Sequence, residues 1–157
     1  MNPEFRQATS QDTKVILELM ESFNKTFGYP FDRVKNTNNL SWLLSHPSSG
    51  LIWLISCNRD IVGYLALTFG FSFEYGGKDA FIDEFYLLER YRHRGIGKAT
   101  LDFVENQAKL LGVHAIHLEV EGLNEEGQKL YRSKGFQGND RKLLTKRTGL
   151  ERPEIFS

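Results

Sequence analysis

Four cationic or titratable side chains and two glycines lie close together in the stretch RHRGIGKATL, residues 92–101. The residues that follow have helical spacing, so the glycines lie at the start of a predicted helix. The first N–H groups of a helix have no partner within it and carry the positive end of its dipole. Glycine lets a bulky anion approach these groups, and Arg92, Arg94 and Lys98 can balance its charge. This pattern predicts a phosphate-binding turn.

Two common phosphate-binding loops do not match this turn. A dinucleotide fingerprint needs G-x-G-x-x-G/A, whereas Gly95 and Gly97 are followed by Thr100 at the third position. A Walker A loop needs Gly-Lys followed by Ser or Thr, with another glycine five residues earlier. Here Ala99 follows Gly97-Lys98, and position 92 is arginine. The phosphate ligand is therefore expected to be held by a turn of another kind.

The spacing of apolar residues predicts strands and helices on both sides of the turn. It predicts strands at residues 4–9, 51–57, 60–73, 80–88 and 115–122, helices at residues 10–27, 38–46, 98–112 and 125–134, and final strand material at Phe136 and residues 141–146. The order βααβββαβαββ indicates an α/β (α+β) fold with helices on the faces of a mixed sheet.

Composition limits the classes of protein. The 157 residues are expected to form one domain, 1–157. A formal net charge of zero disfavours a nucleic-acid or membrane-surface partner. Residues 1–89 carry seven basic against eleven acidic side chains, and residues 90–157 carry thirteen against nine. The acidic first part and the basic second part of the chain could hold a cationic substrate beside an anionic cofactor. The alternative is a chance asymmetry of a solvated surface.

Cysteine and histidine usage predicts neither a disulfide nor a metal site. Cys57 is the single cysteine, and its apolar surroundings predict a buried structural thiol. The four histidines show no metal-ligand spacing with it. The first residues have no apolar core typical of a signal peptide, and no apolar run approaches the ~20 residues of a membrane span, so a cytoplasmic protein is expected.

Two segments together resemble the GNAT superfamily of N-acetyltransferases. Arg92-x-x-Gly95-x-Gly97 is similar to the R/Q-x-x-G-x-G/A turn, in which backbone amides hold the pyrophosphate of acetyl-coenzyme A. Residues 123–136 resemble the family's N-x-x-A-x-x-x-Y-x-x-x-G-F segment, with matches at Asn124, Tyr131, Gly135 and Phe136. Two departures are Glu89, where many members have proline, and Gly127, where alanine is usual. The resemblance implies a mixed, mostly antiparallel twisted sheet of about six to seven strands flanked by about four helices.

The resemblance also implies a reaction: transfer of the acetyl group from acetyl-coenzyme A, a co-substrate used without a metal, to a primary amine. Tyr131 is the expected acid for the leaving thiolate, or else a packed aromatic. Asp83 and Glu84 are the candidate bases, and Asp83 is preferred because it lies four residues before Leu87, whose amide is expected to meet the thioester. Strand alternation would place Asp83 on one face with Phe81, Phe85 and Leu87, and Glu84 on the other with Ile82, Tyr86 and Leu88.

The coenzyme site implied by the resemblance follows the strand into the turn. Its expected residues are Leu87, Leu88, Arg92, His93, Arg94, Gly95, Ile96, Gly97, Lys98 and Asn124. For Asn124 the alternative role is a helix N-cap. For His93 the alternative is simple exposure to solvent.

The acceptor side is less well defined. The family builds its acceptor pocket from the first two helices and the hairpins, which here implies Phe27, Tyr29 and Phe31. Glu119 and Glu121, on one face of the predicted strand 115–122, are further acids that either border the cleft or belong to a solvated face. The aromatic residues Phe69, Phe71, Phe73 and Tyr75 either border this pocket or form a core or homodimer contact.

A small amine such as a polyamine, aminoglycoside or amino-acid derivative is the expected acceptor. A protein N-terminus or lysine, and a sensor that binds acyl-coenzyme A without catalysis, remain as alternatives. A nucleic-acid binder that uses RYRHR and RKLLTKR is disfavoured by the zero net charge.

Overall fold

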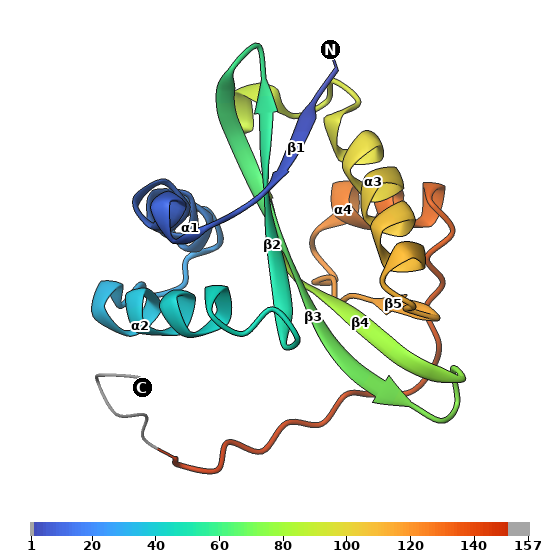
Figure 1. The fold of residues 1–157 in the computed structure, drawn as a ribbon. Helices are drawn as coiled ribbons and strands as arrows, with labels where there is room; N and C mark the ends of the chain where they lie inside the picture. Colours follow the sequence, from blue (N-terminus) through green and yellow to red (C-terminus); the bar gives the residue numbers. More distant parts are fainter. Residues whose placement is uncertain (1, 151–157) are drawn as a thin grey trace.

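A twisted five-stranded sheet organises residues 2–150, the part of the chain that the computed structural model describes (Figure 1). The elements in chain order are β1 (Glu4–Gln7), the 3-10 helix η1 (Ser10–Asp12), α1 (Thr13–Phe27), α2 (Arg33–Leu44), β2 (Gly50–Cys57), β3 (Asp60–Ser72), β4 (Gly77–Leu87), the 3-10 helix η2 (Glu89–Tyr91), α3 (Ile96–Leu110), β5 (Ala115–His117) and α4 (Glu125–Ser133). The predicted α/β (α+β) fold class, a mixed sheet with helices on its faces, is confirmed.

The helices pack on the two faces of this sheet. α1 and α2 cover one face, where Ile16, Leu40 and Tyr64 belong to one buried cluster. α3 and α4 lie on the other face, where Leu101 and Val104 are buried against β3 and β4. The helical spacing of apolar residues in the sequence therefore becomes the contact of each helix with the sheet.

The 3-10 helix η1, which leads directly into α1, is fixed by local hydrogen bonds. Thr9 and Asp12 form a capping box, in which the Thr9 N–H donates to Asp12 Oδ2 at 2.8 Å. Arg6 donates from both terminal nitrogens to the same carboxylate, at 2.8 and 2.9 Å. This pairing holds the pKa of Asp12 below its ordinary value.

The strands follow the order β1-β2-β3-β4-β5, and each pair is antiparallel except β4 with β5. The parallel pair needs a crossover, which α3 supplies. Its register is short, from Asp79 opposite Ala115 to Phe81 opposite His117. β4 then continues to Leu87, so residues 82–87 have β3 on one side and no strand of the described chain on the other.

A β-bulge in β4 corrects the predicted alternation. Ala66 pairs with Glu84 but Leu67 pairs with Ile82, so Asp83 is one extra residue between them. Ile82 consequently packs on the α3 face together with Phe85, three residues later. The prediction that Ile82 and Glu84 share a face was wrong, because strict period two assumes a strand without a bulge.

The end of the chain also differs from the prediction. Five strands form instead of six to seven: within residues 134–150 there is no strand, and the predicted strand 115–122 is shortened to β5. Phe136 still packs on the α3 cluster, but the chain then runs past the β3–β4 hairpin, where Arg141 pairs with Glu74 at 2.7 Å. The stretch 141–146 places two leucines side by side, so it has no alternating pattern that could bury one face.

We expect Leu143→Ser combined with Leu144→Ser to leave the thermal unfolding midpoint unchanged, because these side chains are 66% and 88% exposed. Ile116→Ser, in β5, is the contrasting variant and should lower the midpoint by several degrees, since Ile116 packs on the α3 cluster. Thermal denaturation followed by circular dichroism compares the two. A large loss in the leucine double variant would show that residues 141–146 are packed against the sheet after all.

Candidate active site

The predicted phosphate turn lies between the end of β4 and the start of α3. The first helical N–H to find a backbone acceptor is that of Ala99, which donates to the Gly95 carbonyl at 3.1 Å. Within residues 2–150, the N–H groups of Ile96, Gly97 and Lys98 have no acceptor, and no side chain caps the helix. The helix start therefore presents free donors at the positive end of its dipole, as an anion site requires.

The two glycines of the turn have different physical roles. Gly95 adopts φ +82°, a left-handed conformation that costs an L residue roughly 1–2 kcal/mol, and space is open where its Cβ would lie. Gly97 is helical, and a Cβ there would lie 3.0 Å from Leu130 Cδ2 of α4. Gly95 thus shapes the turn, whereas Gly97 allows α3 and α4 to approach each other.

The cations of the turn are held to different degrees. Arg92 Nε donates to the Leu87 carbonyl at 3.0 Å, and its guanidinium lies 5.5 Å from the Tyr86 ring centre. Arg94 lies over the Tyr91 ring, and His93 Nε2 is 3.4 Å from Glu126 Oε1 with both side chains exposed. Arg92 therefore ties the turn to β4, while the exposed cations remain available to an anion.

The outer edge of β4 beyond Phe81 carries free backbone groups. The Leu88 N–H donates to Val62 on β3 at 2.9 Å. Because successive residues of a strand direct their N–H groups to opposite edges, the Leu87 N–H is directed to the edge away from β3. That is the edge that β5 leaves open, and Arg92 binds the Leu87 carbonyl there. The Leu87 N–H is therefore directed to a side where no strand of the described chain pairs with it, and its use as a donor to a ligand stays a prediction.

Glu84 is held by a residue that the sequence analysis did not identify. The Tyr64 hydroxyl donates to Glu84 Oε1 at 2.8 Å, and Tyr64 is fully buried on the α1 face. Burial raises the pKa of Glu84, an effect that the Tyr64 hydrogen bond partly opposes and the Asp83 charge reinforces. In the sequence, Tyr64 could be noticed only as a tyrosine within an otherwise apolar strand. Its partner Glu84 could not be predicted, because their pairing depends on the strand register across the bulge.

Asp83, the extra residue of the bulge, has a different environment. Its side chain reaches solvent, and it forms no hydrogen bond or ion pair with residues 2–150. Desolvation by the surrounding protein nevertheless raises its pKa, and its charge raises the pKa of both Tyr64 and Glu84. Of the two candidate carboxylates, Asp83 is the one whose oxygens are free.

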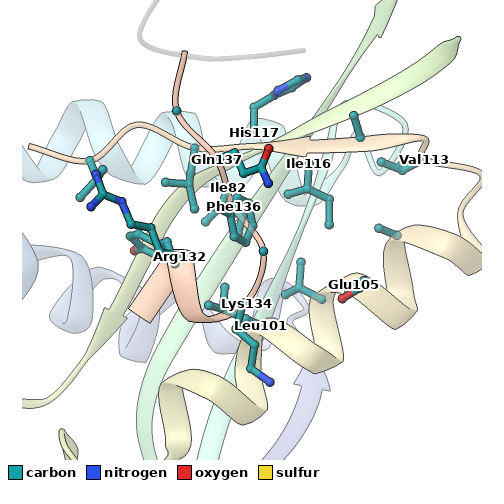
Figure 2. Close-up of a pocket in the computed structure, with 18 of the residues that line it drawn as sticks. Ile82, Leu101, Glu105, Val113, Ile116, His117, Arg132, Lys134, Phe136 and Gln137 are labelled. Carbon is teal, nitrogen blue, oxygen red and sulfur yellow. The ribbon is translucent and has the colours of Figure 1, made fainter. Parts of the chain in front are cut away.

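Tyr131 lies on α4 and lines a hollow of about 890 Å³ between α3, β5 and α4 (Figure 2). Its ring packs against Phe136 at 5.9 Å between centres, while its hydroxyl forms no hydrogen bond within the described chain. Burial raises the pKa of this hydroxyl, which keeps it protonated at neutral pH. The hollow includes neither the glycine turn nor Asp83, so Tyr131 is the one predicted catalytic residue among those that line it.

Asn124 adopts the alternative role that the sequence analysis left open. Its Oδ1 accepts from the Gly127 N–H at 3.0 Å, which makes it the N-cap of α4. A Cβ on residue 127 would lie 2.5 Å from Asn124 Nδ2, so the glycine at the family's alanine position accommodates this cap.

The acceptor-side residues separate into two groups. Phe31 packs in the α1-face cluster, whereas Phe27, Tyr29 and Glu119 are exposed. The Tyr29 hydroxyl donates to Glu121, which joins the α1–α2 loop to the segment after β5.

The aromatic stripe does not border this acceptor-side group. Phe69 packs on the α3-face cluster, but Phe71 and Phe73 are exposed at the end of the β3–β4 hairpin, so they are not core residues. Tyr75 stacks edge-on against His117, with ring centres 4.8 Å apart.

Two absences hold for residues 2–150. No three His, Cys, Asp or Glu side chains there come together in a way that could bind a metal ion. Nor does any helix in that range combine the length and apolarity needed to cross a membrane.

The model of the acetyltransferase (GNAT) family matches residues 16–136, well over half of the chain. The match includes β4, the turn, and α4 up to Phe136, which are the elements that build the site. The chain therefore belongs to the GNAT acetyltransferase family, whose members use acetyl-coenzyme A.

Similar proteins agree with this assignment. An uncharacterized N-acetyltransferase, YycN of Bacillus subtilis (strain 168), is 34% identical over 90 residues, so the match covers 57% of this chain and 56% of that protein. The solved integron cassette protein from the mobile metagenome of Cole Harbour Salt Marsh is 33% identical, with a TM-score of 0.84 over 94% of this chain and 91% of that chain.

A predicted acetyltransferase from Clostridium acetobutylicum, solved with acetyl-coenzyme A, is 21% identical and shares the fold, with a TM-score of 0.78 over 92% of this chain and 96% of that chain.

Gly95→Ala is expected to weaken acetyl-coenzyme A binding at least tenfold, because the turn must distort to relieve the positive φ. Gly112→Ala is the matched control: Gly112 has φ +73° just after the other end of α3, with equally open surroundings. Both variants should lose about 1–2 kcal/mol of stability. Calorimetric titration with acetyl-coenzyme A should separate them, and equal affinities would show that the turn does not hold the coenzyme.

Proposed function

We propose that this protein is an N-acetyltransferase that moves the acetyl group of acetyl-coenzyme A directly to the primary amine of a small molecule, within a ternary complex. The observation that carries the proposal is the free edge of β4: it combines the unpaired carboxylate of Asp83 and the outward Leu87 N–H, and it leads into a turn with three unpaired N–H groups. Family membership supplies the reaction class.

Each group has a role in this proposal. The N–H groups of Ile96, Gly97 and Lys98 bind the pyrophosphate, and the Leu87 N–H polarises the thioester carbonyl and stabilises its oxyanion. Asp83, acting through a water, accepts the proton that the ammonium must lose before its nitrogen attacks the carbonyl carbon. When the carbon–sulfur bond breaks, the Tyr131 hydroxyl donates its proton to the thiolate. The second proton that the attacking nitrogen loses as it becomes an amide restores the Tyr131 hydroxyl.

Glu84 has a supporting role in this assignment. The hydrogen bond from Tyr64 occupies one of its oxygens and fixes its orientation, so Glu84 shapes the charge around Asp83. Asp83 is preferred as the base because no described residue competes for its oxygens.

The Tyr29–Glu121 hydrogen bond favours a small acceptor over a protein. It bridges two segments on either side of the open part of β4, whereas a protein N-terminus or lysine needs an uninterrupted groove for the flanking chain. A sensor that only binds the coenzyme would need neither the free carboxylate of Asp83 nor the free hydroxyl of Tyr131.

Asp83→Asn should lower kcat by about 10²–10⁴-fold and abolish the rise of the rate with pH on the acidic side. Because the pKa of Asp83 is raised in the folded chain, the carboxylate reduces stability as the pH rises through the interval above its unfolded pKa. The variant should therefore be more stable than the wild type at pH 7 and similar to it in strong acid. Kinetics and thermal unfolding across pH measure both effects.

Asp60→Asn, at the start of β3, is the control and should leave rate and stability unchanged. A destabilised Asp83→Asn variant would contradict the assignment, because it would mean that the carboxylate makes a structural contact.

Release of free thiol from acetyl-coenzyme A with a panel of small amines is the direct test of the function. Tyr131→Phe should lower kcat by about 10²-fold or more and leave coenzyme affinity nearly unchanged, because the ring keeps its packing and only the proton donor is lost. Tyr91→Phe is the matched control, because it removes a hydroxyl that has no hydrogen-bond partner within residues 2–150 and leaves the ring contacts in place. Binding of acetyl-coenzyme A without turnover on any amine would instead support the sensor.

A further inference from the structure

The hydrogen bond between Tyr29 and Glu121 joins residues 92 positions apart in the sequence. Both partners stand on well-anchored backbone. Gly28, with φ +73°, ends α1, and the Tyr29 N–H donates to the Asn24 carbonyl at 2.9 Å. On the other side, the Glu121 carbonyl accepts from Gln128 Nε2 at 3.1 Å and from the Asn124 N–H at 3.0 Å. The side-chain bond therefore links two fixed positions.

The linked segments lie on either side of the open part of β4. The α1–α2 loop follows a helix whose Phe23 packs edge-on against Tyr86 of β4, at 5.6 Å between ring centres. Glu121 follows β5, which pairs with β4 no further than Phe81. The bridge therefore joins the side of β4 that α1 covers to the segment that follows its parallel partner β5.

The two partners of the Tyr29–Glu121 hydrogen bond differ in how strongly they can bind other groups. The Glu121 carboxylate can accept about four hydrogen bonds, and in residues 2–150 its side chain has Tyr29 as its hydrogen-bond partner and no ion pair. Tyr29 offers a neutral hydroxyl and is 49% exposed, so little packing holds its ring in place. An ammonium group is a stronger donor to a carboxylate than a phenol, because the hydrogen bond is charge-assisted.

We propose that Glu121 binds a second, non-reacting ammonium group of the acceptor, which displaces the Tyr29 hydroxyl and makes the enzyme selective for linear diamines and polyamines over monoamines. The proposal rests on the proposed acetyltransferase function. The reacting amine then lies at the β4 edge near Asp83, and the distal ammonium lies at Glu121. Tyr29 acts as a competitor that closes the site when no such acceptor is bound.

The test compares 1,4-diaminobutane with butylamine, which has the same carbon chain and one ammonium group. Glu121→Gln should raise KM for the diamine at least tenfold and leave kcat, and both constants for butylamine, unchanged. Tyr29→Phe should change KM for the diamine in the opposite direction, lowering it severalfold, because the competing hydroxyl is gone. Glu125→Gln, an exposed acid in the first turn of α4, is the matched control and should behave as wild type.

Binding without turnover provides an independent measurement. Titration of 1,4-diaminobutane into the protein saturated with coenzyme A should give a dissociation constant at least tenfold weaker for Glu121→Gln than for wild type. Hydrogen exchange at residues 28–32 should become faster in the wild type when the diamine is added, because the Tyr29 contact is released.

The outcomes separate this proposal from the function on which it rests. If the wild type acetylates both amines and Glu121→Gln changes neither KM, selectivity by Glu121 is overturned while the acetyltransferase stands. A higher diamine KM in Tyr29→Phe would overturn the displacement, since the hydroxyl would then assist binding. If the wild type acetylates no amine, the proposed function itself fails.

Discussion

The bulge at Asp83 is the constraint on which the rest of the site depends. One extra residue in β4 places Ile82 and Phe85 on the α3 face while Glu84 meets Tyr64 on the α1 face. The extra residue has no cross-strand partner, so its carboxylate is not used in the ladder. The same strand then continues without β5 to Leu87, whose N–H is directed outward, and the chain next enters the glycine turn with its own free N–H groups. A regular strand would give neither the free acid nor this separation of the faces.

Two adjacent carboxylates are thereby given different environments. Glu84 is half-buried and hydrogen-bonded, and Asp83 reaches solvent without a partner in residues 2–150, yet desolvation raises the pKa of each. The charge of Asp83 raises the pKa of Glu84 further, which a purely structural pair would avoid. An unpaired acid held at such a cost to stability is more typical of a functional site than of a packing position.

Features that depend on a few neighbouring residues could be predicted from the sequence of this chain. Features that depend on contacts between distant residues could not. The glycine turn, the helical stripe with Leu101 and Val104, and the cap at Asn124 depend on a few neighbouring residues, and each lies where such local rules predict. Alternation in β4 failed because a bulge depends on the partner strand. The predicted final strands failed because strand formation needs a buried face, and residues 141–146 are not packed against the sheet. Tyr64 was overlooked because its partner, Glu84, is brought to it by strand register.

By itself, the sequence determined the family, the order of the main elements up to α4 and the position of the turn, because these depend on spacing within short segments. Tertiary structure alone decided which carboxylate stays free, that Gly97 and Gly127 accommodate neighbouring side chains, and that Tyr29 meets Glu121. Those outcomes depend on contacts between residues distant in the chain or on the rotamers of packed neighbours. Free energies of packing and desolvation decide such contacts, and they exist only once the sheet and its helices have come together.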